Sequence, residues 1–490
     1  MDIGTLIRRA AREFGDRPAV RCGEQTLSFV EFDEQTERLA NGFLAAGLRP
    51  GDAVSLLLPN GIELVVSYYA LAKAGLVRVG LNFRDTEDDQ RYKLEDSGSR
   101  ALITTERFEH SVPMTFGPAE LRDLIARSPA TRCEVQTRPE DLLRIGYTGG
   151  TTGRSKGVRL TYGIEMALLR NYLVDLIPEV GPGDVMLHAA PLTHASGSFF
   201  LPHLVRGACN VLLARFEPGE YLHQLAEVDP TCVFLVPTMI SMVIDHPQAR
   251  PGMARSLRLL CYAASPIAPS VAKRAAELFG PVLNQTYGQA EAPMCITLLR
   301  PHEHDRVGSA GRPYTFAEVE IHDADGRPVP AGIEGEVVGR GDIVTPGYLN
   351  RPDETGQTLR GGWLHTGDIG RFDDDGFLFL LDRMNDVIIS GGFNVYPRQV
   401  EDVLMSHPAV AECAVFGTAD DRWGDIVRAA VTLKAPATEA GLLEFAHERL
   451  AGYRRPCSIT ILEQLPKSPA GKILRRQVRD ALAAGFAARP

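Results

Sequence analysis

Apolar residues recur at helical spacing through the first part of the chain. This spacing predicts helices over residues 3–14 and 29–46. Ser28 and Glu31 stand three residues apart in the order of a capping box, and Gly47 follows the second helix. We therefore expect the chain to begin with two amphipathic helices.

Strand-like and helical patterns then alternate. Short apolar runs typical of buried strands occupy residues 53–58, 142–147, 233–236, 257–262 and 282–287. Helical spacing returns between them, at residues 61–75 and again at 269–279, where Pro269 begins the helix. Strands separated by helices predict α/β architecture with parallel sheets, whose ligands bind at the carboxyl ends of the strands.

The pattern changes after Pro313. Short strand-like segments are separated by turn sequences at residues 323–326, 330–332 and 373–376, which predicts a small mainly-β subdomain ending near Leu381. This subdomain belongs to the large N-terminal domain, which we place at residues 1–382.

A second domain is expected at residues 383–490. It combines predicted strands at 387–390 and 410–417 with a helix that begins at Pro397 and another near 440–450. About 105 residues suffice for an independent small α+β domain. The junction between the two domains, residues 382–385, is a candidate hinge.

Composition narrows the function classes. Of 490 residues, 44% are hydrophobic and 23% charged, as in ordinary globular proteins, and the net charge is −10 with no Lys/Arg run longer than a pair. This charge argues against a nucleic-acid partner. No apolar stretch approaches the ~18 residues of a membrane span. The eight cysteines lie far apart with no Cys-x-x-Cys, which predicts buried, reduced thiols and a cytoplasmic protein.

The segment 147–157, Tyr-Thr-Gly-Gly-Thr-Thr-Gly-Arg-Ser-Lys-Gly, suits a phosphate cradle. Its glycines let backbone N–H groups turn inward, its threonines add hydroxyl donors and its lysine adds positive charge. The order differs from a Walker A loop because Ser155 precedes Lys156. A flexible surface turn is the alternative. The candidate phosphate ligands are Thr148, Gly149, Gly150, Thr151, Thr152, Gly153 and Lys156.

This loop resembles the phosphate loop of the adenylate-forming superfamily, which includes acyl-CoA and aryl-CoA ligases, adenylation domains and beetle luciferases. Further motifs of that superfamily follow in order along nearly the whole chain: PLTHASG at 191–197, YGQAE at 287–291, GEVVGRG at 335–341, WLHTGD at 363–368, DRMNDVIISGGFNVYP at 382–397 and PKSPAGKILRR at 466–476. The resemblance implies ATP, Mg²⁺ and coenzyme A as cofactors.

By this resemblance, Glu291 is the carboxylate associated with magnesium, a hard cation that prefers oxygen ligands. Tyr287, followed by Gly288, stacks on adenine, although a core tyrosine is the alternative. Asp368 accepts hydrogen bonds from the ribose hydroxyls, and Arg383 makes a second ribose contact.

The resemblance also assigns the moving parts. Lys472, at the end of the C-terminal domain, places positive charge near the departing pyrophosphate. Asn385 takes the hinge position. The loop with Gly391 and Gly392 faces the site in the thiol step. The catalytic residues implied are Lys472, Glu291, His194, Thr148 and Lys156.

His194 bears on the substrate. Adenylation domains that select α-amino acids generally have an aspartate here, so histidine favours a carboxylic acid without an α-amino group. A core or surface histidine is the alternative. By analogy of position, the walls of the acid pocket are His194, Phe199, Met239, Tyr262, Ala264 and Met294.

The chain departs from the family pattern at three places. Ala290 replaces threonine, Gly149 replaces serine, and Tyr262 with Ala263 replaces a common Ser-Gly pair. Lost hydroxyl donors of this kind slow adenylation by roughly tenfold each. These departures leave the identity of the acid open.

The sequence predicts an ATP-dependent carboxylic acid:CoA ligase that forms an acyl adenylate and then a thioester. Two alternatives stay open: an adenylating enzyme that uses a carrier-protein thiol, an amine or another nucleophile, and a nucleotide-binding regulator without turnover. The oligomeric state is also left open. A serine hydrolase is disfavoured because no Gly-x-Ser-x-Gly elbow occurs.

Overall fold

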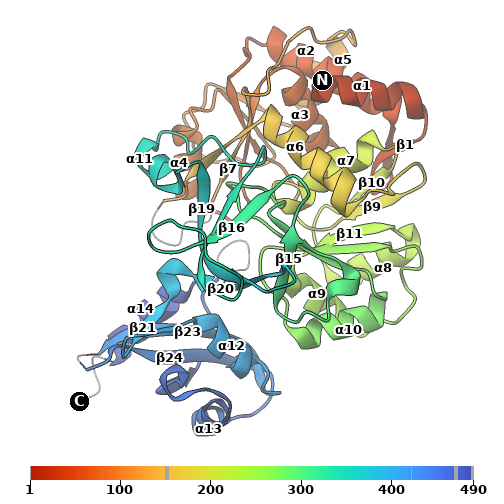
Figure 1. Ribbon diagram of the computed structural model, residues 1–490. Coiled ribbons are helices and arrows are strands. Elements are labelled where there is room, and N and C mark those ends of the chain that lie inside the picture. The colour runs from red at the N-terminus through yellow and green to blue at the C-terminus, as the bar shows by residue number, and fades with distance from the viewer. Residues whose placement is uncertain (1, 149–153, 421, 468–472, 487–490) are drawn as a thin grey trace. The chain divides into compact units, whose positions relative to one another are not determined.

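The computed structural model describes residues 2–148, 154–420, 422–467 and 473–486. The chain forms two compact units, shown in Figure 1. Unit 1 contains residues 1–148, 155–319 and 339–364, and unit 2 contains residues 320–338 and 365–490. The domain boundary predicted between residues 382 and 383 stays a prediction.

The first sheet of unit 1 has six strands. In spatial order they are β6 (Met114–Phe116), β5 (Ala101–Thr104), β3 (Ala53–Leu57), β4 (Val77–Gly80), β7 (Leu142–Tyr147) and β8 (Gly157–Thr161). The first five run parallel, and β8 turns back antiparallel to β7. The strands predicted near residues 53–58 and 142–147 are therefore confirmed.

Helices cover both faces of this sheet. They are α1 (Ile3–Phe14), α2 (Phe29–Ala45), α3 (Ile62–Lys73), α4 (Glu87–Asp96) and α5 (Pro118–Arg127). Because strand side chains alternate, Leu56 packs in the core shared with α1, α2 and α3, whereas Leu57 packs against Leu94 of α4. The capping box of α2 is confirmed: Glu31 N–H donates to the Ser28 hydroxyl, and Ser28 N–H donates to the Glu31 carboxylate.

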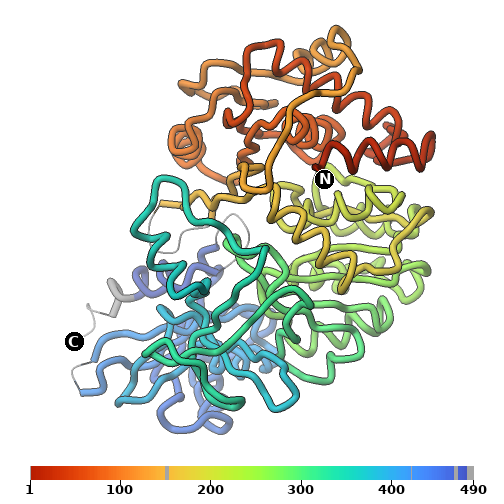
Figure 2. The backbone as a smooth tube through the Cα atoms, turned by 45° about the horizontal axis from the view of Figure 1, so that its top comes forward, coloured from red at the N-terminus to blue at the C-terminus, as the bar shows by residue number. Residues whose placement is uncertain are grey.

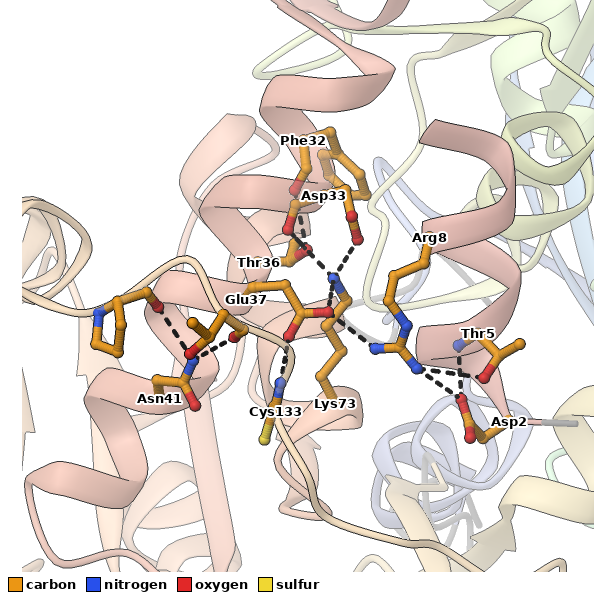
Figure 3. Close-up of polar contacts among 12 residues, drawn as sticks. Asp2, Thr5, Arg8, Phe32, Asp33, Thr36, Glu37, Asn41, Lys73 and Cys133 are labelled. Carbon is orange, nitrogen blue, oxygen red and sulfur yellow. Dashed lines mark hydrogen bonds and ion pairs between the residues drawn. The ribbon is translucent and has the colours of Figure 1, made fainter. Parts of the chain in front are cut away.

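A buried charge network joins these helices, as Figure 3 shows. The Lys73 ammonium lies 2.5 Å from Asp33 Oδ1 and 2.9 Å from Glu37 Oε1. Arg8 of α1 donates to the same Glu37 oxygen at 2.8 Å, and Cys133 N–H donates to the other. Burial by itself would raise the pKa of Glu37, but the Lys73 charge and the Cys133 N–H outweigh burial and lower it. The network fixes the three N-terminal helices to one another.

The second sheet carries most of the remaining strands of unit 1. In spatial order these are β2 (Gln25–Ser28), β1 (Pro18–Cys22), β10 (Cys209–Leu212), β9 (Val185–His188), β11 (Cys232–Leu235), β12 (Leu259–Tyr262), β13 (Leu283–Tyr287), β14 (Thr297–Leu299) and β15 (Ser309–Pro313). The N-terminal strand β1 lies beside β10, with Val20 opposite Asn210, so chain segments far apart in sequence are neighbours (Figure 2). From β1 through β13 these neighbours run parallel.

Helices accompany this sheet as the alternating pattern predicts. They are α6 (Tyr162–Asn171), which continues as a π-helix over Tyr172–Leu176, α7 (Phe200–Val205), α8 (Pro218–Val228), α9 (Pro237–Ile244) and α10 (Pro269–Phe279). The strand predicted at 233–236 ends one residue earlier, because Pro237 opens α9 and makes Val236 its N-cap. Unit 1 is completed by α11 (Pro352–Thr358) and β18 (Leu359–Arg360).

Unit 2 contains the predicted β-rich segment and the C-terminal α+β fold. The strands β16 (Glu318–His322), β17 (Gly335–Arg340), β19 (Trp363–Phe372) and β20 (Leu378–Arg383) follow in this spatial order, and each of the first three has two residues in unit 1. A second sheet comprises β22 (Phe393–Val395), β21 (Ile388–Ser390), β24 (Gly424–Leu433) and β23 (Val410–Asp420), with β25 (Ser458–Ile461) beside β24. The β-rich segment reaches Arg383 rather than Leu381.

Helices pack on both faces of the C-terminal sheet. The apolar side chains of α12 (Pro397–Met405) and α13 (Glu439–Arg449) share a core with Cys413 and Val415 of β23. Ala414 and Phe416 of the same strand form a separate core on the other face, together with Val478 of α14 (Arg475–Phe486). The predicted helices at Pro397 and near 440–450 are confirmed.

All eight cysteines lie in the described part of the chain and are free. Five are buried and two half-buried, but Cys457 is exposed, so the prediction of burial is wrong for this residue. Cys457 follows Pro456 in a connection before β25, where a thiol reaches solvent. Over the described ranges, no helix has the length and apolarity that a membrane crossing requires.

Candidate functional site

The ends of the glycine-rich loop are closed by a β-hairpin in unit 1. Tyr147 at the end of β7 lies opposite Gly157 at the start of β8. Thr148 N–H donates to the Lys156 carbonyl at 3.1 Å, and Lys156 N–H donates to the Thr148 hydroxyl at 3.3 Å. The predicted phosphate ligands Gly149, Gly150, Thr151, Thr152 and Gly153 lie outside the described residues. The hairpin fixes the positions at which the loop leaves and rejoins the sheet.

The predicted adenine-binding segment begins at the carboxyl end of β13. Tyr287 is the last residue of that strand, and a tight turn brings Met294 back against Gly288. A Cβ atom on Gly288 would lie 2.4 Å from Met294 N, so a side chain cannot be accommodated there. Met294 itself has φ of 61°, a conformation uncommon for a residue with a side chain. Close backbone approach therefore explains the glycine of the YGQAE motif.

Glu291 and Lys156 of unit 1 each contact the side chain of Tyr348. The Tyr348 hydroxyl donates to Glu291 Oε1 at 2.6 Å, and the Lys156 ammonium lies 4.9 Å from the centre of the Tyr348 ring. Thr345 N–H also donates to the Glu291 carbonyl at 2.7 Å. Sequence reasoning missed Tyr348. Its position in the segment TPGYLN after the GEVVGRG motif was the available signal.

Ala290, where the family pattern has threonine, packs against an apolar cluster of Val158, Leu160, Ile164 and Tyr348. A methyl side chain suits this position because it needs no hydrogen-bond partner. Packing explains how the fold tolerates the departure.

His194 lies in the connection that follows the carboxyl end of β9, six residues after the last residue of that strand. Solvent reaches its ring, yet desolvation by the surrounding protein lowers its pKa. Its Nε2 is 3.3 Å from the Asn82 amide nitrogen. In either protonation state an imidazole carries no negative charge, so it cannot form the ion pair that an aspartate would form with an ammonium group.

A buried histidine, His188, contacts Ser196 of the PLTHASG motif. His188, the last residue of β9, has its two ring nitrogens 2.9 Å from the Ser196 hydroxyl and from Asn210 Oδ1. Complete burial lowers the pKa of His188 to about 3. Sequence reasoning missed this contact, although histidine at the end of an apolar strand was a visible signal.

The other predicted pocket residues have different surroundings. Phe199 is completely buried beside the rings of Tyr172 and Phe234. Tyr262 is also buried, and its hydroxyl donates to Gln285 Oε1 at 2.8 Å. Met239 and Met294 belong to the same core cluster, whereas Ala264 is exposed with φ of 75°. Their role as pocket walls stays a prediction.

In unit 2, both predicted ribose ligands pair with each other. Asp368 of β19 is the cross-strand partner of Arg383 on β20, and Arg383 Nε lies 2.7 Å from Asp368 Oδ1. Glu336 supports this strand: one carboxylate oxygen accepts from Gly367 N–H, and the other is 2.7 Å from His365 Nδ1. Glu336 thus links the GEVVGRG and WLHTGD motifs, a contact that the sequence did not reveal.

The predicted hinge is exposed and lies between two anchored carboxylates. Asn385 sits in a short 3₁₀ turn, Met384–Asp386. Arg475, at the start of α14, contacts Asp382 at 2.7 Å and Asp386 at 3.0 Å. Lys472, predicted to be catalytic, lies outside the described residues.

Gly391 and Gly392 form the two-residue turn between β21 and β22. Both have positive φ, of 59° and 82°, as a type I′ hairpin requires. This turn accounts for the paired glycines in the motif, whereas their role in the thiol step stays a prediction.

The donor set around Glu291 fits a magnesium ion. The described residues contain no group of three or more His, Cys, Asp or Glu side chains that could enclose a metal. Magnesium commonly binds one or two carboxylates together with substrate phosphates and water, so a single positioned carboxylate suits it.

Comparison with known proteins decides the family. A model of the AMP-binding enzyme family matches residues 7–349, and a model of the AMP-binding enzyme C-terminal domain matches residues 399–472. The chain belongs to the AMP-binding enzyme family. The predicted membership of the adenylate-forming superfamily is confirmed.

Relatives of this AMP-binding enzyme match over nearly their whole length. It is 38% identical to a feruloyl-CoA synthase of Amycolatopsis sp, over 97% of this chain and 98% of that protein. It is 35% identical to a 2-succinylbenzoate–CoA ligase of Bacillus cereus (strain Q1), over 95% of this chain and 96% of that protein.

A solved structure supports the fold assignment. The o-succinylbenzoate CoA synthetase MenE of Bacillus subtilis, in complex with its acyl-adenylate intermediate OSB-AMP, has a TM-score of 0.89 at 32% identity. The similarity covers 97% of this chain and 98% of that one. MenE has also been solved with ATP and a magnesium ion. The predicted fold class, a large N-terminal α/β part and a small C-terminal domain, is confirmed.

Proposed function

We propose that this AMP-binding enzyme is an ATP-dependent carboxylic acid:CoA ligase, which forms an acyl adenylate and then an acyl-CoA thioester. A free carboxylate resists nucleophiles because its charge repels them and oxide is a poor leaving group. Transfer of AMP to the acid corrects both faults. The two relatives named above are, by their names, enzymes of CoA thioester formation.

The observation that carries the proposal is the placement of an anion and a cation around Tyr348. Glu291 offers an oxygen ligand for the cation that accompanies ATP, and Lys156 offers positive charge at the root of the glycine-rich loop. When bound, Mg²⁺ supplies positive charge to the phosphate oxygens.

We assign the remaining ATP contacts from the family motifs. Tyr287 and Gly288 would receive adenine, Asp368 and Arg383 the ribose, and the loop from Thr148 to Lys156 the phosphates. Asp368 is suited to paired ribose hydroxyls because a carboxylate has two acceptor oxygens.

The first step is in-line attack. A carboxylate oxygen of the acid bonds to the α-phosphorus, the bond to the β-phosphate bridging oxygen breaks, and pyrophosphate leaves with its electrons. Lys472 would stabilise the charge that moves onto pyrophosphate. In the second step the thiol sulfur bonds to the acyl carbon, AMP leaves, and the thiol proton is lost.

The two steps need different groups. We infer that residues 383–490 act as a domain that turns about Asn385 relative to residues 1–382. The turn at Gly391 and Gly392 would serve the thiol step. Such an exchange explains why one domain carries both Lys472 and the glycine turn.

The substrate is proposed to be a carboxylic acid without an α-ammonium group. The ring of His194 supplies no negative charge that would pair with such a group. Aryl acids are the first candidates, because feruloyl and 2-succinylbenzoyl groups are named in the relatives. The pocket would be lined by the six residues His194, Phe199, Met239, Tyr262, Ala264 and Met294.

The cellular setting follows from the thiols. Eight free cysteines suit a reducing compartment, so we propose a cytoplasmic enzyme. Coenzyme A is the proposed acceptor, with carrier-protein thiols and amines as alternatives in the test.

The experiment is pyrophosphate release from ATP across a panel of aryl, fatty and amino acids, with and without CoA, followed by mass spectrometry of the products. Acid-dependent release with acyl-CoA formation is expected. Acid-dependent release that yields product only with an amine or a carrier protein would reassign the acceptor. No release with any acid would leave a nucleotide-binding regulator.

A further inference from the structure

We propose that Tyr348 is a positioning residue of the ATP site, which orients the Glu291 carboxylate toward the divalent cation and supports the Lys156 ammonium beside the phosphates. This inference rests on the proposed function. It adds a residue that lies outside the motifs identified in the sequence.

The backbone of Tyr348 is fixed to the glycine-rich hairpin. Tyr348 forms an antiparallel bridge with Val158 of β8, and Leu349 N–H donates to the Gly157 carbonyl at 2.7 Å. Arg159 N–H donates to the Gly347 carbonyl at 3.0 Å. The segment around Tyr348 therefore continues the sheet next to Lys156, as an extra strand would.

The same segment is fixed to the glutamate. Thr345 N–H binds the Glu291 carbonyl while the Tyr348 hydroxyl binds Oε1, so the backbone and the side chain of Glu291 are both held by residues 345–348. Among the described residues Oε2 accepts no hydrogen bond, which leaves that oxygen as the ligand for a cation. A hydrogen bond to one carboxylate oxygen orients the other, as outer ligands do in metal sites.

The ring of Tyr348 interacts with the positive charge of Lys156. Lys156 Nζ lies within the distance at which an ammonium is attracted to an aromatic face. Tyr348 is 8% exposed, so the ring is held by its surroundings and cannot swing away. One buried side chain thus sets the separation of the anion and the cation.

The position before Tyr348 requires glycine. Gly347 has φ of 127°, and a Cβ atom there would lie 2.3 Å from Thr355 Cγ2. Tyr348 N–H donates to the Thr355 hydroxyl at 3.0 Å. The turn that aims Tyr348 at Glu291 therefore depends on its glycine neighbour and on α11.

Binding of α,β-methylene-ATP, which resists cleavage at the α–β bond, tests the proposal by calorimetry at varied Mg²⁺. Tyr348→Phe keeps the ring and loses the hydroxyl. We expect the half-saturating Mg²⁺ concentration to rise roughly tenfold or more, the size expected for loss of a hydrogen bond to a charged group. Nucleotide affinity in EDTA should stay within about twofold of wild type, since the ring remains under Lys156. Tyr348→Leu should weaken binding in EDTA as well.

Two comparisons separate positioning from general structure. Tyr162→Phe removes another buried tyrosine hydroxyl of unit 1, which donates to the Ala72 carbonyl at 2.7 Å, and should leave the Mg²⁺ dependence unchanged. In a Glu291→Gln background, Tyr348→Phe should add less than about a twofold effect, because the hydroxyl acts through the carboxylate.

Equal Mg²⁺ dependence for wild type and Tyr348→Phe would overturn the inference. A full effect that persists in the Glu291→Gln background would also overturn it. Failure of the wild-type protein to bind the nucleotide at any Mg²⁺ concentration would instead contradict the proposed function.

Discussion

Asp368 and Arg383 are cross-strand partners on β19 and β20, and their charged groups lie 2.7 Å apart. The carboxylate is nearly buried, with its side chain 11% exposed, whereas that of the arginine is 50% exposed. Arg383 therefore holds a carboxylate oriented at the end of the β-rich segment, next to the predicted hinge. The pair brings together two predicted ribose ligands that are 15 residues apart in sequence.

The first prediction concerns this pair. Asp368→Asn removes the charge that aligns Arg383 and replaces an acceptor oxygen by a donor nitrogen. We expect the dissociation constant for α,β-methylene-ATP to rise by roughly 10- to 100-fold, as for loss of a charged hydrogen bond. Glu318→Gln, which breaks the exposed pair with Arg340, is the control and should leave binding unchanged. Unchanged affinity in Asp368→Asn would contradict the ribose assignment.

The second prediction separates the two half-reactions. Lys472→Ala should slow acid-dependent pyrophosphate release by roughly 10²-fold or more, since a transition-state donor is lost. Thioester formation from synthetic acyl adenylate and CoA should survive. Lys467→Ala, which removes an ion pair with Glu412, is the matched control in the same segment. Equal loss of both steps would contradict the division of labour.

The third prediction is a pH dependence of stability that arises from His188. Its pKa is about 3 in the folded protein and near 6.5 when unfolded, so only the unfolded state takes up the proton between these values. The stabilisation is complete above pH 6.5 and declines as the pH falls toward 3, by about 1.4 kcal/mol per pH unit. His188→Gln removes this dependence. In urea unfolding, the free energy of unfolding of wild type relative to that of His188→Gln should fall by about 2 kcal/mol between pH 7 and pH 5.

The fourth prediction concerns the buried network of Figure 3. Lys73→Met leaves Glu37 and Asp33 without their shared cation, and we expect the free energy of unfolding to fall by about 3–5 kcal/mol. Arg9→Ala, which breaks an exposed pair with Glu13, should cost less than about 1 kcal/mol. A loss for Lys73→Met as small as that of the control would show that the network contributes little.

The same network predicts a response to acid. The pKa of Glu37 is lowered in the folded state, so its stabilisation is present above the ordinary carboxyl pKa and is lost as the pH falls through the lowered value. Glu37→Gln should therefore be less stable than wild type at pH 7, and the difference should narrow below about pH 4. A difference that stayed constant with pH would assign the effect to packing.

Much of the fold is encoded in local patterns. The capping box at Ser28 and Glu31, the helix-starting prolines 237, 269 and 397, and the buried strand runs all specify elements through contacts between near neighbours. Where a predicted strand is present, the difference lies at its ends, as at β12, which begins at Leu259 rather than at residue 257. Local rules fix the centre of an element better than its ends because terminal residues have neighbours on one side only.

The candidate site divides in the same way. The motifs predicted Glu291, Lys156, Asp368 and Arg383 as site residues from residue order alone, since each motif carries its own chemistry. Tyr348, Glu336 and His188 were missed. Each acts on a partner distant in sequence, as Tyr348 does on Glu291 across 57 positions, and nothing in the local pattern encodes that contact.

The sequence by itself determined the alternation of helices and strands and the family, and it predicted which residues bind nucleotide and metal. Only the tertiary structure decided which supporting side chains hold those residues. The physical reason is range: helix caps, strand periodicity and turn glycines depend on neighbours along the chain. The orientation of a carboxylate or an imidazole depends instead on hydrogen bonds that sheet pairing brings within 3 Å.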